Sequence, residues 1–403
     1  MKIGLLLDGW EPCIGGVITS TKSLQKGLEM LGHKVYIITL NSYPIKKEIK
    51  HGPCILKLQG GIPLFLKGTE GYRLVLRYKK FLPQIEALNL DVIHVHTEAG
   101  IGHLGLYASS QLKLPLVYTM HSMYHFFIEK NNFIWLKIFK KIILKYLDYL
   151  LKKFISKANV VVVPTQKTLS FLKERYKIEK NYQIIPTGIS LEKFGKENYS
   201  SEEINNLKEK LGLKNFFVCL FIGRISKEKS IDHNINNFSA FHKQNKKSKF
   251  LIIGDGPEKK NLKKQVEKLN LKNKIIFLNF VPNEQVGLYY QLGDVFINSS
   301  LFETQGLTYI EALASSLPIV ARYDEALEGV IQNGENGFFY SNEKEFVQIL
   351  NILSNDQEKY KKISLQAQKS VHNYKQEIFA KKMINIYQKV IYENKKRLEN
   401  KTI

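Results

Sequence analysis

The chain has 403 residues and a formal net charge of +23 at pH 7. This length exceeds one ordinary hydrophobic core and suits two domains of about 200 residues each. Hydrophobic residues make up 44% of the chain, a share that excludes a disordered or fibrous protein. The longest stretch without a charged residue covers 15 residues, 114–128, which is too short to span a bilayer. Because the first residues also lack a signal cleavage site, we expect the protein to stay in the cytoplasm.

Positive charge is concentrated in the first half. Residues 1–190 hold 27 Lys and Arg against 12 Asp and Glu, whereas residues 191–403 hold 33 against 25. Such an excess suits nucleic acid, anionic lipid or a phosphorylated ligand, and by itself it does not choose among them.

Short apolar runs alternate with stretches of helical spacing along the whole chain. In the first half, strand patterns at 2–7 and 35–39 flank a glycine-containing loop and a helical pattern at 23–31, and further strands are expected at 92–96, 116–119 and 160–163. In the second half, strands are expected at 216–222, 250–253, 275–278 and 295–298, and the series ends near 319–320. This alternation is typical of parallel sheets covered by helices.

We therefore predict an α/β protein of two doubly wound domains, residues 1–190 and 191–380. The linker between them should lie near 187–200. A lysine-rich helix at 381–403 is expected to cross back and pack on the first domain.

The strongest motif is Glu-Thr-Gln-Gly-Leu-Thr-Tyr-Ile-Glu at 303–311, which follows a predicted strand and begins a helix. Its glycine lets a ligand approach the backbone, and amides at a helix N-terminus donate to phosphate or sugar oxygens. The motif thus indicates a ligand site with two carboxylates, Glu303 and Glu311. In the structural alternative, Glu303 caps the helix and Glu311 is a surface residue.

A second loop carries two cations. The segment Gly-Arg-Ile-Ser-Lys-Glu-Lys at 223–229 follows a strand and places Arg224 and Lys229 where a diphosphate could lie between them, and Gly-Asp-Gly-Pro at 254–257 follows the next strand. Open sheets bind ligands at the carboxyl ends of their strands, so these loops should share one edge. Two cations there would offset the charge of a leaving diphosphate. The alternative for both cations is a solvated loop.

Together with Gly15-Gly16, these motifs resemble the family 4 retaining glycosyltransferases of the GT-B fold, and the resemblance covers most of the chain. It implies two Rossmann-like domains that face each other across a cleft. Segments 16–20, 91–98, 287–291 and 303–309 further resemble bacterial 1,2-diacylglycerol 3-glucosyltransferases. The closer resemblance implies a retaining hexosyltransferase that moves α-glucose from UDP-glucose to the 3-hydroxyl of 1,2-diacylglycerol.

The resemblance also implies roles for individual residues. Arg224 and Lys229 would bind the diphosphate of the donor, Glu311 the ribose, and Glu303 a hydroxyl of the transferred sugar. His121 would face the reacting sugar from the end of a first-domain strand, and it completes the expected catalytic set with Glu303, Arg224 and Lys229. The remaining expected donor-binding residues are Gly15, Gly16, Val281, Gln305, Gly306 and Leu307.

Three further histidine and carboxyl side chains are candidates for the acceptor pocket. His94 and His96 alternate along one strand and so share a face, with Glu98 just beyond. They either line the acceptor pocket or are core residues whose hydrogen-bonding groups all have partners. For His121 the alternative is a packed or capping histidine.

The sequence contains no Asp-x-Asp pair. The two cations are therefore the expected partners of the diphosphate, and we predict no metal site and no essential metal ion. Whether magnesium stimulates the reaction stays open.

Residues 133–155 combine apolar and aromatic side chains with lysines at helical spacing. Such a helix can lie in the headgroup layer with its lysines on anionic lipid. The alternative is an ordinary helix packed on the first domain. A second basic amphipathic stretch lies at 73–80. The expected membrane-binding residues are Arg73, Arg77, Lys80, Trp135, Lys137, Lys140, Lys141, Lys145 and Lys152.

These observations predict a peripheral, monotopic enzyme at the cytoplasmic face of the cell membrane. Its first domain would bind the acceptor and the membrane, and its second the nucleotide sugar. The nearest alternative is an enzyme of the same fold that uses UDP-galactose, or that acts on a polysaccharide or another lipid-linked acceptor. A nucleic-acid partner is disfavoured because no nucleic-acid module is recognisable. A non-catalytic membrane protein is disfavoured because the donor-site charges are intact.

Overall fold

The computed structural model describes residues 1–400 apart from Pro12, Ile14, residues 42–53, 64–72 and 131–133, and Leu301. The side chains of residues 127, 129–130 and 134–138 also lie outside the described set. The chain divides into two compact units. Unit 1 comprises Met1–Ile189 with Gln376–Ile403, and unit 2 comprises Ser190–Lys375.

Unit 1 is built on a parallel sheet with the strand order β3-β2-β1-β6-β7-β8-β9. The strands are β1 (Lys2–Leu6), β2 (Lys34–Leu40), β3 (Ile55–Leu58), β6 (Val92–Val95), β7 (Leu116–Thr119), β8 (Val160–Val163) and β9 (Tyr182–Ile184). Both faces of this sheet are apolar. In β8, Val160 and Val162 join one core, and Val161 and Val163 join the other. A continuous β-branched run is what a strand buried on both faces requires.

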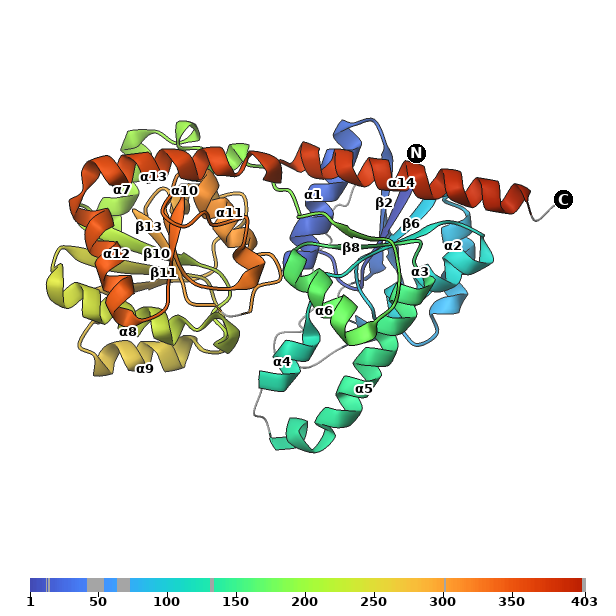
Figure 1. Cartoon of the computed structure of the whole chain (residues 1–403), viewed down its shortest axis with the longest axis horizontal. Coiled ribbons are helices and arrows are strands. Elements are labelled where there is room, and N and C mark those ends of the chain that lie inside the picture. The colour runs from blue at the N-terminus through green and yellow to red at the C-terminus, as the bar shows by residue number, and fades with distance from the viewer. Residues whose placement is uncertain are drawn as a thin grey trace. The chain divides into compact units, whose positions relative to one another are not determined.

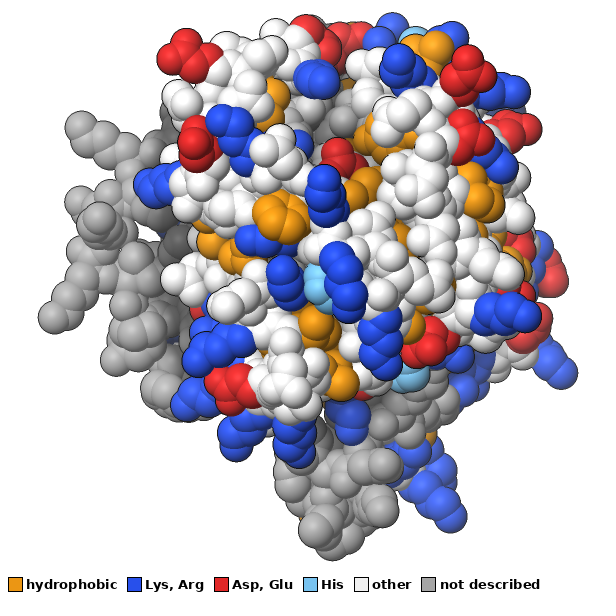
Figure 2. Space-filling model, turned by 90° about the vertical axis from the view of Figure 1, so that its left-hand side faces the viewer, with side chains coloured by type: hydrophobic (Ala, Val, Ile, Leu, Met, Phe, Trp, Pro, Cys, Tyr) orange, Lys and Arg blue, Asp and Glu red, His pale blue; other side chains and the backbone are white. Residues whose placement is uncertain are grey.

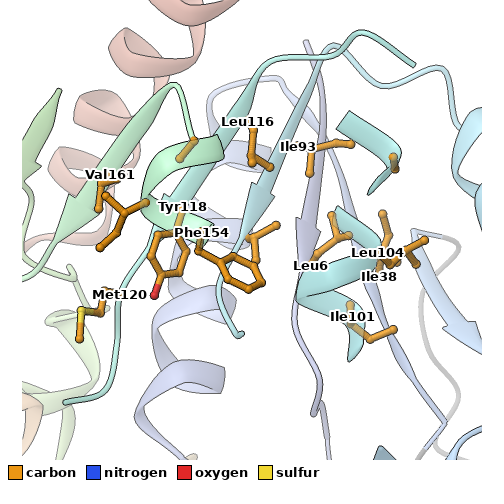
Figure 3. Packing of buried hydrophobic residues seen from close by; sticks show 14 of the residues in the cluster. Leu6, Ile38, Ile93, Ile101, Leu104, Leu116, Tyr118, Met120, Phe154 and Val161 are labelled. Carbon is orange, nitrogen blue, oxygen red and sulfur yellow. The ribbon is translucent and has the colours of Figure 1, made fainter. Parts of the chain in front are cut away.

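Helices cover both faces of this sheet (Figure 1). One core contains α1 (Gly16–Met30) and α14 (Gln376–Glu399). The other contains α2 (Leu82–Glu86), α3 (Gly100–Gln111), α5 (Ile134–Lys157) and α6 (Gln166–Tyr176). Figure 3 shows this second core, in which the ring of Phe154 on α5 lies 5.4 Å from that of Tyr118 on β7. Unit 1 also contains α4 (Tyr124–Lys130), the antiparallel pair β4 (Ile62–Pro63) and β5 (Arg73–Leu74), and the 3-10 helix η1 (Tyr78–Phe81).

Helix α14 belongs to unit 1 although all of unit 2 precedes it in the sequence. Phe379, Met383, Tyr387 and Val390 recur at helical spacing and are buried in the same core as α1. The helix begins at Gln376 rather than at residue 381, the start predicted from the lysine-rich pattern.

Unit 2 repeats the doubly wound arrangement with the parallel order β12-β11-β10-β13-β14-β15. The strands are β10 (Phe217–Ile222), β11 (Ser248–Ile253), β12 (Ile275–Leu278), β13 (Val295–Asn298), β14 (Ile319–Arg322) and β15 (Gly337–Tyr340). The α-helices are α7 (Ser201–Lys210), α8 (Ile231–Gln244), α9 (Lys259–Lys268), α10 (Val286–Tyr290), α11 (Leu307–Ala314), α12 (Glu343–Asn355) and α13 (Gln357–Ser370). The 3-10 helices are η2 (Glu192–Phe194), η3 (Lys196–Asn198), η4 (Lys227–Lys229), η5 (Glu325–Leu327) and η6 (His372–Tyr374).

The face of the molecule in Figure 2, built largely by unit 2, carries Lys and Arg side chains interspersed with acidic ones. Hydrophobic side chains appear there as small areas between the charged groups. Among the described helices, none is both long and apolar enough to cross a membrane.

The alternating α/β prediction is confirmed, but several details were wrong or missed. The first helix begins at Gly16, not at residue 23. Its first half was read as loop because it follows Gly15, begins with Gly16 and holds several polar residues. Ser20 and Ser23 are nevertheless buried, and they bond to Thr187 and to the carbonyl of Gly188. Strands β3, β9 and β15 of the two parallel sheets were missed because none of them is an unbroken β-branched run.

Candidate active site

An ion pair in unit 2 joins Lys229 and Glu303. Lys229 ends η4, which follows β10, and Glu303 follows β13. Strands β10 and β13 are neighbours, so both loops leave the same edge of the sheet. The ammonium Nζ of Lys229 lies 2.7 Å from Oε1 of Glu303, and both side chains are largely buried. The structure thus brings together two of the residues predicted for the diphosphate and the sugar.

Arg224 lies in the same loop as Lys229. Its side chain is exposed, and no described residue pairs with it. It therefore presents a permanent positive charge to solvent at the edge where the ion pair sits.

The segment 254–257 supports the Arg224 loop through its backbone. The amide of Ile225 donates to the carbonyl of Asp255 at 2.9 Å. A Cβ at Gly254 would lie 1.9 Å from the carbonyl oxygen of Gly223, and a Cβ at Gly256 would lie 2.2 Å from that of Ile225. Both glycines are therefore required for close packing of the two loops, which is a structural role that the sequence did not reveal.

Helix α11 begins immediately after Gly306. This glycine has φ +78°, and a Cβ there would lie 2.8 Å from the ring of Tyr309. Gln305 is buried and Leu307 is the first residue of the helix, so the three predicted backbone positions lie at its N-terminus. Amides at such a terminus are donors for anionic or sugar oxygens.

Two residues that the sequence did not single out hold the carboxylates in place. Tyr290 donates from its hydroxyl to Oε2 of Glu311 at 2.8 Å, and Asp324 accepts from the amide of Glu303 at 3.3 Å. Burial raises the pKa of Glu311, and the bond from Tyr290 partly opposes this. Neither Glu303 nor Glu311 fits the structural alternative, because Gly306 occupies the cap position and Glu311 is half-buried and hydrogen-bonded. Tyr290 lies within the motif 287–291, and that motif was the one feature of the sequence that could have indicated it.

Val281 lies just beyond β12 and is half-buried. The side chain of Asn279 in this loop accepts from Nζ of Lys259 at 2.8 Å, and Phe280 beside it is exposed. The loop therefore offers both backbone and an aromatic face at the same edge of the sheet.

In unit 1, Gly15 and Gly16 form the start of α1. A Cβ at either position would meet no atom within 4 Å, so the backbone there is open. The loop predicted from the sequence is thus the N-terminus of a 15-residue helix. Its first amides are available to an anion.

Three histidines of unit 1 lie at the carboxyl ends of β6 and β7. His121 is half-buried, and its Nε2 lies 2.9 Å from Nδ1 of His96. His94 is buried, with Nδ1 on the hydroxyl of Tyr387 and Nε2 on that of Thr119, each at 2.7 Å. Burial lowers the pKa of His121 to about 4, so its ring is neutral at pH 7. His94 matches the satisfied core histidine that the sequence left open as an alternative.

Glu98 is a buried carboxyl group with a neutral partner. The hydroxyl of Tyr118 donates to its Oε1 at 2.5 Å. Burial raises the pKa of Glu98 to about 7, although the bond from Tyr118 opposes the shift. Nearby Asp8 accepts from Thr97 and from the amide of Ile101, and burial raises its pKa also.

The predicted membrane-binding residues lie on two surfaces of unit 1. Arg73 donates to the carbonyl of Gly61, and Arg77 and Lys80 are exposed. Of the predicted lysines on α5, Lys141, Lys145 and Lys152 are exposed and Lys140 is half-buried. The side chains of Trp135 and Lys137 lie outside the described residues.

Helix α5 carries an apolar stripe that the lysine pattern did not single out. Phe139, Ile142, Tyr146 and Tyr149 are spaced as one helix face, and each is between 52% and 65% exposed. On the opposite side, Asp148 anchors the helix through a bidentate contact with Arg175 on α6.

Comparisons with known proteins place these features in a family. Residues 14–193 match the model described as Glycosyltransferase Family 4, and residues 203–370 match Glycosyl transferases group 1. The chain is 38% identical over 402 residues to alpha-monoglucosyldiacylglycerol synthase of Acholeplasma laidlawii, covering 100% of both chains. It is 31% identical to the Streptococcus pneumoniae protein of the same name, covering 85% of this chain and 76% of the relative.

A solved structure has the same fold. The Anabaena protein Alr3699/HepE, crystallised in complex with UDP and glucose, superimposes with a TM-score of 0.75 at 19% identity, covering 96% of this chain and 100% of that one. The two doubly wound units and the two family models together make this chain a glycosyltransferase of the GT-B fold. This chain belongs to the family 4 glycosyltransferases.

Proposed function

We propose that this enzyme transfers glucose from UDP-glucose to the 3-hydroxyl of 1,2-diacylglycerol with retention of the α configuration. The contact between Lys229 and Glu303, beside the exposed Arg224, carries the transferase part of this proposal. The acceptor is proposed from the full-length likeness to the Acholeplasma synthase.

The ion pair suggests how the donor enters. A diphosphate bound beside Arg224 would take over the ammonium of Lys229. Glu303 would then lose its ammonium partner, so a new donor in place of Lys229 would stabilise the buried carboxylate. A hydroxyl of the transferred glucose supplies that donor. The site therefore favours a ligand that carries a diphosphate and a sugar together over either part alone.

Glu311 and the N-terminus of α11 complete the proposed donor site. The oxygens of Glu311 are oriented by Tyr290 to accept from the ribose hydroxyls. The amides near Gln305, Gly306 and Leu307 donate to sugar and phosphate oxygens, and the loop at Val281 holds the base.

The transfer proceeds on one face of the sugar. The bond between the anomeric carbon and the diphosphate breaks while the acceptor hydroxyl attacks from the same side. Its proton passes to the departing phosphate oxygen, so no protein nucleophile is needed. Lys229 and Arg224 offset the charge that grows on the leaving group. His121 contacts the reacting sugar, and no essential metal ion takes part.

We also propose that unit 1 lies on an anionic membrane surface. The exposed stripe of Phe139, Ile142, Tyr146 and Tyr149 is flanked by exposed lysines on the same helix. An apolar face with a basic border fits the interface of a bilayer that contains anionic lipid. This position would give the enzyme access to a water-insoluble acceptor.

The test is transfer of radiolabelled sugar from UDP-glucose, with UDP-galactose in parallel, to diacylglycerol in mixed micelles with and without anionic phospholipid. We expect an α-glucosyl lipid whose formation requires the anionic lipid. A soluble saccharide as acceptor in place of the lipid would overturn the acceptor, and a faster reaction with UDP-galactose would overturn the donor.

A further inference from the structure

His96 has no role in the proposed transfer, yet it touches the one histidine that does. Nδ1 of His96 lies 2.9 Å from Nε2 of His121, and the planes of the two rings differ by 24°. His96 is 2% exposed, and burial together with its histidine neighbours lowers its pKa well below the ordinary value. Both rings are therefore neutral, and each carries a single N–H.

Two proton arrangements satisfy this contact. In the first, Nδ1–H of His96 donates to Nε2 of His121, so that His121 carries its own proton on Nδ1. In the second, Nε2–H of His121 donates to Nδ1 of His96, so that His96 must carry its proton on Nε2.

The surroundings of His96 distinguish the two. Its Nε2 is enclosed, and no hydrogen-bond partner for it exists among the described residues. His94, whose ring centre lies 4.0 Å away, already has both nitrogens occupied by Tyr387 and Thr119. The second arrangement would bury an unpaired N–H, whereas the first leaves only an unpaired lone pair. Buried N–H groups without an acceptor are the rarer case in proteins.

We infer that His96 locks His121 in the tautomer with its proton on Nδ1, so that His121 meets the ligand as a hydrogen-bond donor and not as a proton acceptor. Nδ1 of His121 has no partner in the described part of the chain and is not among the enclosed nitrogens. His96 is thus a positioning residue. The nature of the ligand oxygen rests on the proposed function, but the tautomer does not.

The direct measurement is long-range proton–nitrogen NMR of the full chain labelled with 15N-histidine, near pH 7 and without substrate. We expect the protonated nitrogen to be Nδ1 in both His96 and His121. Protonated Nε2 in His121 would overturn the inference. Because no substrate is present, this result is independent of whether the proposed transfer is correct.

Variants test the consequence. His96→Phe fills the ring volume without a donor, and His96→Asn keeps a donor near Nδ1 but loses volume. We expect His121 to lose its single tautomer in His96→Phe, with kcat/KM for donor falling roughly threefold to tenfold, the size of one neutral hydrogen bond. His96→Asn should lie closer to the original enzyme. If His96 only fills space, that order reverses.

His94→Phe is the matched control, since it removes a buried histidine of β6 whose hydrogen bonds go to Tyr387 and Thr119 and not to His121. It should lower thermal stability and leave the NMR signature of His121 unchanged. A changed signature in this control would show that the tautomer reports general packing, which contradicts the inference.

Discussion

Glu98 of unit 1 and Glu303 of unit 2 are each 8% exposed and each follow a strand of a parallel sheet. Glu98 is bound by the neutral hydroxyl of Tyr118, and burial raises its pKa to about 7. Glu303 is bound by the ammonium of Lys229. The two carboxyl groups are equally exposed, so the difference between them lies in the hydrogen-bond partner, which is a neutral hydroxyl for Glu98 and a charged ammonium for Glu303.

This difference extends to the surroundings of both residues. Unit 2 places Arg224 and Lys229 at its strand ends, where they suit a ligand with a diphosphate. Unit 1 places neutral histidine rings at the equivalent edge, and they suit hydroxyl groups of a sugar or an acceptor. Under the proposed function, unit 2 would supply the charged contacts to the ligand and unit 1 the neutral ones.

The largest expected effect is the loss of kcat on substitution of Glu303 in unit 2. Glu303→Gln should lower kcat by about 100-fold to 1,000-fold, because a neutral amide interacts more weakly with the sugar as charge develops in the transition state. Initial rates at saturating UDP-glucose measure this loss.

The double variant Lys229→Met/Glu303→Gln separates catalysis from stability. It removes both charges, so it should recover much of the thermal stability that Lys229→Met alone loses. Recovery of activity along with stability would mean that the ion pair is only structural.

The next effect concerns Glu98 in unit 1, and it depends on pH. The pKa of Glu98 is higher in the folded chain, so between pH 4.5 and about 7 the folded state holds the extra proton. The unfolding free energy of unit 1 therefore falls as pH rises through this window, by about 3 kcal/mol when the ionisation is complete. Glu98→Gln should remove this loss.

Denaturant unfolding of both proteins at pH 4.5 and pH 8 checks the sign. The advantage of Glu98→Gln should grow with pH. If the original chain gains stability relative to this variant as pH rises, Glu98 is ionised in the fold and the contrast with Glu303 fails.

A smaller effect is expected where a neutral group orients a carboxylate. Tyr290→Phe removes the donor to Glu311, so the KM for UDP-glucose should rise about tenfold, the value of a hydrogen bond to a charged acceptor. Tyr360→Phe is the matched control, because this hydroxyl donates to the carbonyl of Asp294 in the same unit. Equal kinetic effects in both variants would remove Tyr290 from the donor site.

The smallest effects are expected at the surface of unit 1. Lys141→Gln and Lys145→Gln should each weaken binding to anionic vesicles roughly threefold to fivefold, with no change for neutral vesicles. Phe139→Ser should weaken binding to both. Co-sedimentation measures binding, and Leu365→Ser, on an exposed apolar residue of unit 2, serves as the control. If none of the three α5 substitutions changes binding to vesicles, the membrane proposal is contradicted.

The sequence predicted the parallel sheets because their strands are buried on both faces and therefore read as unbroken β-branched runs, as at 160–163. It also predicted which loops gather, since the carboxyl ends of neighbouring strands meet at one edge. It did not predict which side chains contact each other at that edge. The contact of His96 with His121 depends on the register of β6 against β7, in which Val95 faces Tyr118, and no local pattern encodes that register.

The errors have a related cause. Polar residues on a buried helix face were read as loop because their partners are distant in sequence, as Thr187 is from Ser20. Tyr290 was overlooked for the same reason, since its acceptor Glu311 lies on another helix. Residue propensity and hydrophobic periodicity predict which apolar side chains are buried, but they do not predict which polar side chains pair in the interior.

The position of α14 has a consequence for synthesis of the protein. A ribosome releases the segments in sequence order, so all of unit 2 emerges before residues 376–399, which fill one core of unit 1. Unit 2 can complete its fold while the first-made unit still lacks Met383, Tyr387 and Val390. Until translation reaches them, only α1 covers that side of the first sheet and His94 lacks its Tyr387 partner, so the nascent chain exposes apolar surface during that interval.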